Sequence, residues 1–137
     1  MTEPRFEEWV AKAEEDYVVA SSLDTERTPT AICFHCQQCV EKYLKAALVR
    51  HGVPIHRTHN LTVLNDLVAE QDPRFEWFHD KLGILNPYSV MGRYPGFDLA
   101  ADDATRALEV GSRLRRQIRA LLDLQAKPDG EGERAGK

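Results

Sequence analysis

The residues with the clearest capacity for chemistry include four polar side chains on one predicted helix. Gln38, Glu41, Lys42 and Lys45 recur at spacings of three and four, which places them on one side of that helix. Such a side offers hydrogen-bonding and cationic groups to a phosphate or to an acidic partner. We therefore expect Gln38, Lys42 and Lys45 to contribute to ligand binding. An ordinary surface salt bridge between Glu41 and Lys45 is the alternative.

A second candidate site is a late loop with the sequence NPYSVMGRYPGF at residues 86–97. Its prolines limit the conformations of the loop and so lower the entropy lost when its side chains bind a partner. Arg93 can grip two phosphate oxygens with its planar guanidinium, and Tyr94 can stack on a base. We expect these two residues to be the main anchor for a phosphate-bearing ligand or an acidic partner. The alternative is that Arg93 pairs with Asp16 or Glu41 inside the fold.

Cysteines and histidines form two clusters that invite a metal-binding interpretation. Cys33, Cys36 and Cys39 spell CxxCxxC, but on a helix their sulfurs rise about 9 Å and spread over roughly 120°, so they cannot converge on one ion. We expect them to be small, buried core residues. The second cluster consists of His51, His56 and His59. We expect solvated or backbone-bonded histidines there, with His59 the best ligand-binding candidate because a helix begins beside it. We predict neither a metal site nor a cofactor.

Charge and composition exclude several classes of protein. The chain has 137 residues, 29% of them charged, and a formal net charge of -4, which excludes a strongly basic protein that coats nucleic acid. No apolar run approaches the roughly 18 residues that span a bilayer, and the acidic start is unlike a secretory signal. An odd number of cysteines within seven positions argues for a reducing compartment. We expect a cytoplasmic protein with no membrane contact.

Apolar periodicity predicts helices throughout and no strand. The expected helices cover residues 5–22, 28–51, 60–68, 73–85 and 99–124, with an ordered loop at 86–97. We therefore expect an all-α fold, an antiparallel up-and-down bundle of four long helices plus a short fifth helix, in one domain over residues 1–124. Residues 125–137 are expected to form a disordered tail. Asp16 lies at the edge of an apolar stripe and needs a cationic or hydrogen-bonding partner.

Five arginines of the last predicted helix raise the possibility of a nucleic-acid surface. They lie on both flanks of the apolar arc and opposite it, so they form no single stripe. We expect a solvated polar face that is partly paired with the acidic first helix.

Four stretches together resemble the HEPN domain family of prokaryotes. They are AKAEEDYVVA at 11–20, FHCQQCVEKYLKAAL at 34–48, THNL at 58–61 and RYPG at 93–96. The resemblance covers nearly the whole chain to about residue 124. It implies an antiparallel bundle of four or five helices, frequent homodimers, and frequent pairing with a minimal nucleotidyltransferase in a toxin-antitoxin-like module.

Many family members are metal-independent endoribonucleases whose motif is an arginine, four to six residues and a histidine. This spacing occurs here as Arg50 to His56 and as Arg74 to His79, but the first pair crosses a predicted helix end and Phe75 follows Arg74. The chain resembles more closely the branch that keeps the late RYP signature without a nuclease motif. We therefore expect a non-catalytic module that binds a nucleotide, an RNA end or the nucleotidyltransferase. The alternative is an endoribonuclease toxin that uses Arg74 and His79.

Overall fold

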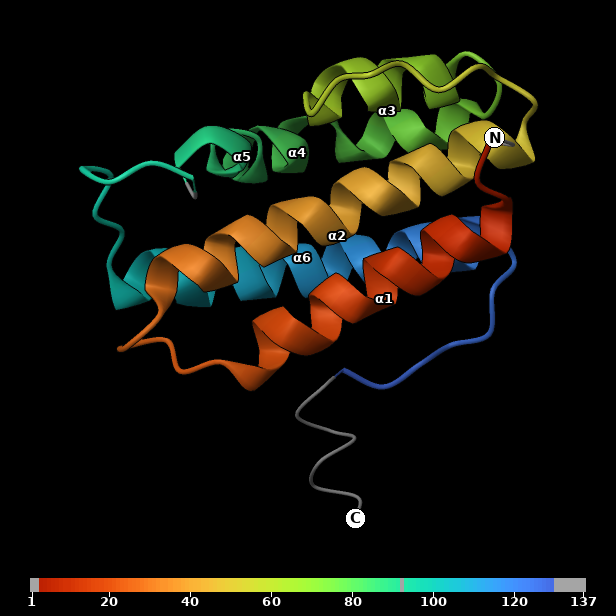
Figure 1. The fold of residues 1–137 in the computed structure, drawn as a ribbon. Coiled ribbons are helices and arrows are strands. Elements are labelled where there is room, and N and C mark those ends of the chain that lie inside the picture. The colour runs from red at the N-terminus through yellow and green to blue at the C-terminus, as the bar shows by residue number, and fades with distance from the viewer. Residues whose placement is uncertain (1–2, 92, 130–137) are drawn as a thin grey trace.

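The computed structural model describes residues 3–91 and 93–129, and every regular element in these ranges is a helix (Figure 1). The prediction of an all-α fold is confirmed. The elements are α1 (Phe6–Ser22), α2 (Pro29–Arg50), α3 (Leu61–Ala69), the 3-10 helix η1 (Pro73–Phe78), α4 (His79–Leu85), α5 (Tyr88–Met91) and α6 (Ala101–Leu121). The long helices α1 and α6 both pack against α2, and the short helices α3, α4 and α5 cover another side of α2.

The helix expected at 73–85 is divided into two shorter ones. Three helices of the described chain are therefore long rather than four, because this stretch forms the 3-10 helix η1 and the seven-residue helix α4, whereas α3 has the nine residues expected of the short helix. In a 3-10 helix, residues three apart share a side. Phe75 and Phe78 use this spacing to bury both rings edge to face, with centroids 5.4 Å apart. The late loop contains one helical turn, α5.

Helix α2 is covered on nearly all sides. Fourteen of its 22 residues are buried, including Gln38, Glu41 and Lys45, which the sequence pattern placed on an outward polar side. The prediction of an outward side for these residues is wrong, because α1, α6 and the short helices all pack against this one helix. Buried polar groups need hydrogen-bond partners, so these side chains are drawn into an internal network. Leu48 is also fully buried.

The three cysteines lie where α2 meets its neighbours and are buried, as predicted. Burial raises the pKa of the Cys33 thiol to about 12 and raises the pKa of Cys36 and Cys39 as well. Small residues allow α2 and α6 to approach closely here, since a Cβ atom at Gly111 would lie 3.3 Å from the Cβ of Cys36. These thiols therefore serve packing.

A buried ion cluster joins α1 to α6. Both carboxylate oxygens of Glu14 accept hydrogen bonds from Arg115, at 2.8 Å each, and the guanidinium of Arg119 lies 3.7 Å from the same carboxylate. The expected pairing of the last helix with the acidic first helix is thus confirmed. The expectation that these arginines are solvated is wrong for Arg115 and Arg119, because the Glu14 carboxylate allows their charges to be buried.

After α6, residues 125–129 have no regular secondary structure but contact the bundle. The Gln125 carbonyl accepts a hydrogen bond of 3.1 Å from Arg119 Nε, and Asp129 forms ion pairs with Arg115 and Arg116. The rest of the predicted disordered tail, residues 130–137, lies outside the described residues. Over the ranges that are described, no helix combines the length and the apolar character needed to cross a membrane.

Candidate binding groove

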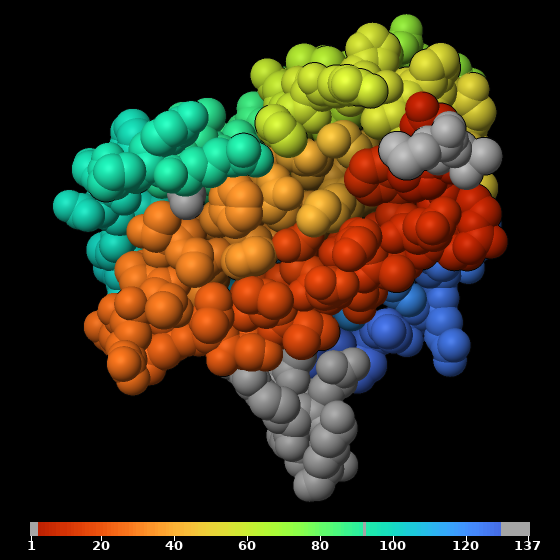
Figure 2. All heavy atoms as spheres, viewed as in Figure 1, coloured from red at the N-terminus to blue at the C-terminus, as the bar shows by residue number. Residues whose placement is uncertain are grey.

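A groove of about 650 Å³ opens between the start of α3 and the segment that runs from α4 into the late loop. Its polar and aromatic lining comes from His59, Asn60, Asn86, Ser89, Arg93 and Tyr94. In Figure 2 the late-loop segment (teal) lies beside the N-terminal half of α2 (orange), on the same face as the connector that precedes α3 (yellow). Two segments that are far apart in the sequence therefore form one surface.

Two asparagines hold these segments together. The Asn60 side chain caps α3 by accepting hydrogen bonds from the backbone N–H groups of Thr62, at 3.0 Å, and Val63, at 3.3 Å. Asn86 Oδ1 accepts from the Leu61 backbone N–H at 2.8 Å, and Asn86 Nδ2 donates to Asn60 Oδ1 at 3.1 Å. The start of α3 and the start of the late loop are thus joined by side-chain hydrogen bonds.

A buried carboxylate positions His59 at the groove. Glu41 is only 3% exposed, and its oxygens accept hydrogen bonds from Lys45 Nζ at 3.0 Å, from Gln37 Nε2 at 3.2 Å and from His59 Nδ1 at 3.0 Å. Gln37 Nε2 also donates to the His59 carbonyl at 3.0 Å, which holds the backbone of that residue. The imidazole itself is about half exposed. Since Nδ1 faces Glu41, Nε2 is the nitrogen that can serve a ligand.

Of the three other helix residues expected to bind ligand, Gln38 and Lys45 belong to this network, and none of the three lines the groove. Gln38 donates to Gln37 and to Glu41, and Lys45 lies between Glu41 and the Trp9 ring, 5.5 Å from the ring centroid. Lys42 pairs with Asp16, which confirms that Asp16 has a cationic partner. His35 Nδ1 lies 2.8 Å from the second oxygen of Asp16.

Arg93 and Tyr94 lie on the exposed side of the groove. The alternative that Arg93 pairs internally with Asp16 or Glu41 is wrong, because Arg93 is exposed and neither carboxylate forms an ion pair with it in the described part of the chain. Instead, the guanidinium carbon of Arg93 lies 5.7 Å from the centroid of the Phe34 ring, a cation–π contact. Tyr94 is 60% exposed. The positive charge of Arg93 is therefore directed to the surface, where a ligand can reach it.

Three of the four side chains in the two arginine–histidine pairs with nuclease-like spacing have contacts elsewhere. Arg74 forms two hydrogen bonds to Asp72, at 2.9 and 2.7 Å, and these bonds lower the pKa of the Asp72 carboxyl. His79 Nδ1 lies 3.8 Å from an oxygen of Asp66. Arg50 donates to the Leu122 carbonyl at 2.9 Å and thereby joins the ends of α2 and α6. Arg74 and Arg50 therefore have hydrogen bonds that a structural role explains, whereas the contact of His79 is longer and exposed.

Sequence reasoning identified part of the groove and missed the rest. His59, Arg93 and Tyr94 were expected at a binding site and lie in one groove. Gln37 and Asn86 were not expected, although the four-residue spacing of Gln37 from Glu41 was visible in the sequence.

Anywhere in residues 3–91 and 93–129, no group of three or more histidine, cysteine or acidic side chains is arranged to hold a metal ion.

The chain folds as a helical domain in which residues of the THN and RYP segments line one groove. A model of the HEPN domain matches residues 6–121, and the chain belongs to this family. The chain is also similar to the protein named "Putative toxin MJ1304" from Methanocaldococcus jannaschii, with 35% identity over 95 residues. This match covers 64% of the present chain and 61% of that relative, so the chain spans about three fifths of its length. The resemblance seen in the sequence is confirmed.

Proposed function

We propose that this chain is the HEPN component of a toxin-antitoxin-like system and that it works as a binding module. Membership of the HEPN family and similarity to a protein named as a toxin support the toxin-like role. The proposed partners are a second copy of the chain and a minimal nucleotidyltransferase. The proposed compartment is the cytoplasm, which the three free cysteines favour.

One observation carries the proposal of binding: His59 and Arg93, from segments joined by the Asn60–Asn86 hydrogen bond, line the same groove. An arginine fork binds phosphate oxygens in pairs, and an imidazole nitrogen adds a further hydrogen bond. Tyr94 supplies an aromatic surface on which a base can stack. This combination suits a nucleotide or the end of an RNA strand.

Apolar side chains around the groove support a protein partner as well. Val90, Tyr94 and Phe97 are each 43–60% exposed, all within one short stretch of the late loop. Large apolar side chains exposed together are typical of a surface that another molecule covers. The groove and these exposed side chains of the late loop are therefore the surface that we assign to the nucleotidyltransferase.

The test of the groove is RNA binding by fluorescence anisotropy with a labelled single-stranded RNA. Replacing Arg93 by Gln removes one charge-assisted phosphate contact, so we expect about tenfold weaker binding and a shallower dependence on salt. Arg106→Gln is the matched control, because Arg106 is an exposed arginine of α6 that does not line the groove. Equal affinity of both variants for RNA would remove nucleic acid from the proposed function.

A further inference from the structure

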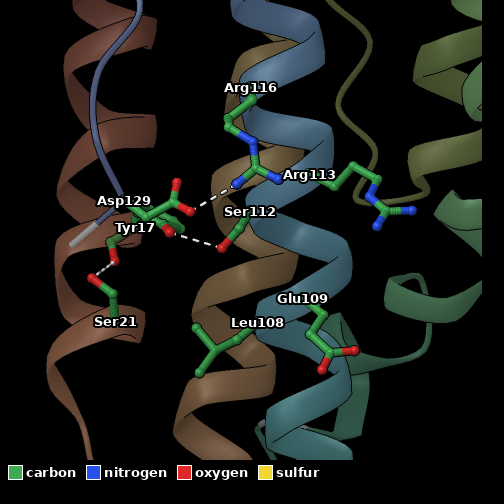
Figure 3. A pocket seen from close by; sticks show the side chains of 8 residues that line it. All are labelled: Tyr17, Ser21, Leu108, Glu109, Ser112, Arg113, Arg116 and Asp129. Carbon is green, nitrogen blue, oxygen red and sulfur yellow. Dashed lines mark hydrogen bonds and ion pairs between the residues drawn. The ribbon is translucent and has the colours of Figure 1, made fainter. Parts of the chain in front are cut away.

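A second groove lies between α1 and α6, remote in sequence from the late loop (Figure 3). Its open volume is about 320 Å³. Tyr17 of α1 and Ser112 of α6 form its floor, and their hydroxyl oxygens are 2.7 Å apart. Asp129, from the segment that follows α6, lies over this hydroxyl pair.

Two arginines of α6 contact Asp129 at this groove, and their charges are compensated to different degrees. Arg115 is 1% exposed, and Glu14 compensates its charge through two hydrogen bonds. Its NH1 group lies 3.4 Å from Asp129 Oδ1. Arg116 NH1 lies 2.7 Å from Asp129 Oδ2. Within the described chain, this contact is the ion pair that Arg116 forms. Without Asp129, Arg116 would have no ion-pair partner among the described residues, although Glu109 also lines the groove.

The Asp129 carboxylate thus takes the place that an anion would occupy. It bridges one buried and one exposed guanidinium beside two hydroxyl groups, which is a donor set suited to phosphate oxygens. The attachment of Asp129 is weak for an ion pair inside a fold, because its side chain is 39% exposed and its segment has no regular secondary structure. Open volume remains beside the carboxylate.

We propose that the groove between α1 and α6 is a binding site for a small molecule that bears a phosphate group, and that Asp129 is its intramolecular competitor. Phosphate oxygens accept from Arg116, from the NH1 group of Arg115 and from one hydroxyl of the Tyr17–Ser112 pair, because the other hydroxyl donates within the pair. Binding displaces the carboxylate of Asp129 from the arginines. The site is separate from the Arg93 groove and does not depend on it.

The test is a titration of the full chain with inorganic phosphate, followed by amide NMR. We expect chemical-shift changes around Ser112 and Arg116. Replacing Asp129 by Asn removes the competitor, so the apparent affinity should rise about threefold to tenfold, in proportion to the fraction of sites that Asp129 had blocked. Glu70→Gln is the charge-matched control on an exposed carboxylate outside the groove and should change nothing.

Two further variants test whether phosphate binds at this site. Arg116→Gln should weaken phosphate binding severalfold, whereas Arg106→Gln, at an exposed arginine of α6 that lines neither groove, should leave it unchanged. A parallel titration with uridine monophosphate separates the sources of the phosphate: tighter binding than inorganic phosphate assigns the site to nucleotides, and equal binding assigns it to the phosphate group alone. Equal affinities for Asp129→Asn and Glu70→Gln, or shifts confined to the Arg93 groove, would overturn the proposal.

Discussion

Neutralising the carboxylate of Glu14 should strongly destabilise this fold. The Glu14 carboxylate accepts two hydrogen bonds from Arg115, which is 101 positions away in the sequence, and a third from the hydroxyl of Tyr43. Its side chain is 16% exposed and that of Arg115 is 1% exposed. Replacing Glu14 by Gln keeps the shape of the side chain but leaves the guanidinium of Arg115 buried without its counter-charge.

The size of the effect follows from this burial. Breaking a buried ion pair by removing one charge costs about 3–5 kcal/mol. Because Glu14 retains some exposure and the amide oxygen of Gln still accepts one hydrogen bond, we expect the lower end, about 3 kcal/mol. For a domain of this length each kcal/mol lowers the melting temperature by about 4 °C, so the variant should melt about 12 °C lower.

The assay is urea unfolding together with a thermal melt, and Glu15→Gln is the matched control. Glu15 is the next residue of α1, its side chain is 70% exposed, and its carboxylate lies 3.7 Å from Lys12 Nζ. The control should change the free energy of unfolding by less than about 1 kcal/mol. A double variant with Arg115→Met should lose less than the sum of the two single losses, because the buried charge is then gone. If Glu14→Gln is no more destabilising than Glu15→Gln, the reasoning is refuted.

Four other outcomes are expected. Burial opposes ionisation of Glu14, but hydrogen bonds from Arg115 and Tyr43 lower its pKa below the ordinary 4.5, so its contribution to stability is present above that value and is lost as the pH falls through the lower folded pKa. The stability difference between wild type and Glu14→Gln should therefore shrink between pH 6 and pH 3 in urea melts, and a constant difference would contradict this. The three buried cysteines of α2 should react slowly with a thiol dye in the native state and fast in denaturant, and rapid native labelling would argue against burial. Light scattering should report about twice 15.6 kDa, whereas a monomer at tens of micromolar would count against a dimer. Incubation with structured or single-stranded RNA without metal should give no cleavage by wild type, Arg74→Ala or His79→Ala; cleavage by wild type that both variants lose would establish the nuclease alternative.

Local chemistry along the chain accounts for the features that could be predicted from the amino-acid sequence. The start of α2 at Pro29, the cap of α3 at Asn60 and the turn at Gly52, whose φ is 69°, depend on neighbouring residues along the chain. The family resemblance was equally visible, since its motifs are short stretches of sequence. The burial of the cysteines followed from their place on the apolar arc of one helix.

Tertiary packing determined those features that a wheel projection of a single helix cannot show. Periodicity describes one helix at a time, whereas the burial of Lys45 and Glu41 arises because α2 is covered by three sets of neighbours. For the same reason Arg115 is buried on an apparently polar side, as its counter-charge comes from a helix at the other end of the chain. The contact of His59 with Glu41 likewise joins residues 18 positions apart across a connector. Such pairings depend on long-range packing, which the pattern of a single helix does not encode.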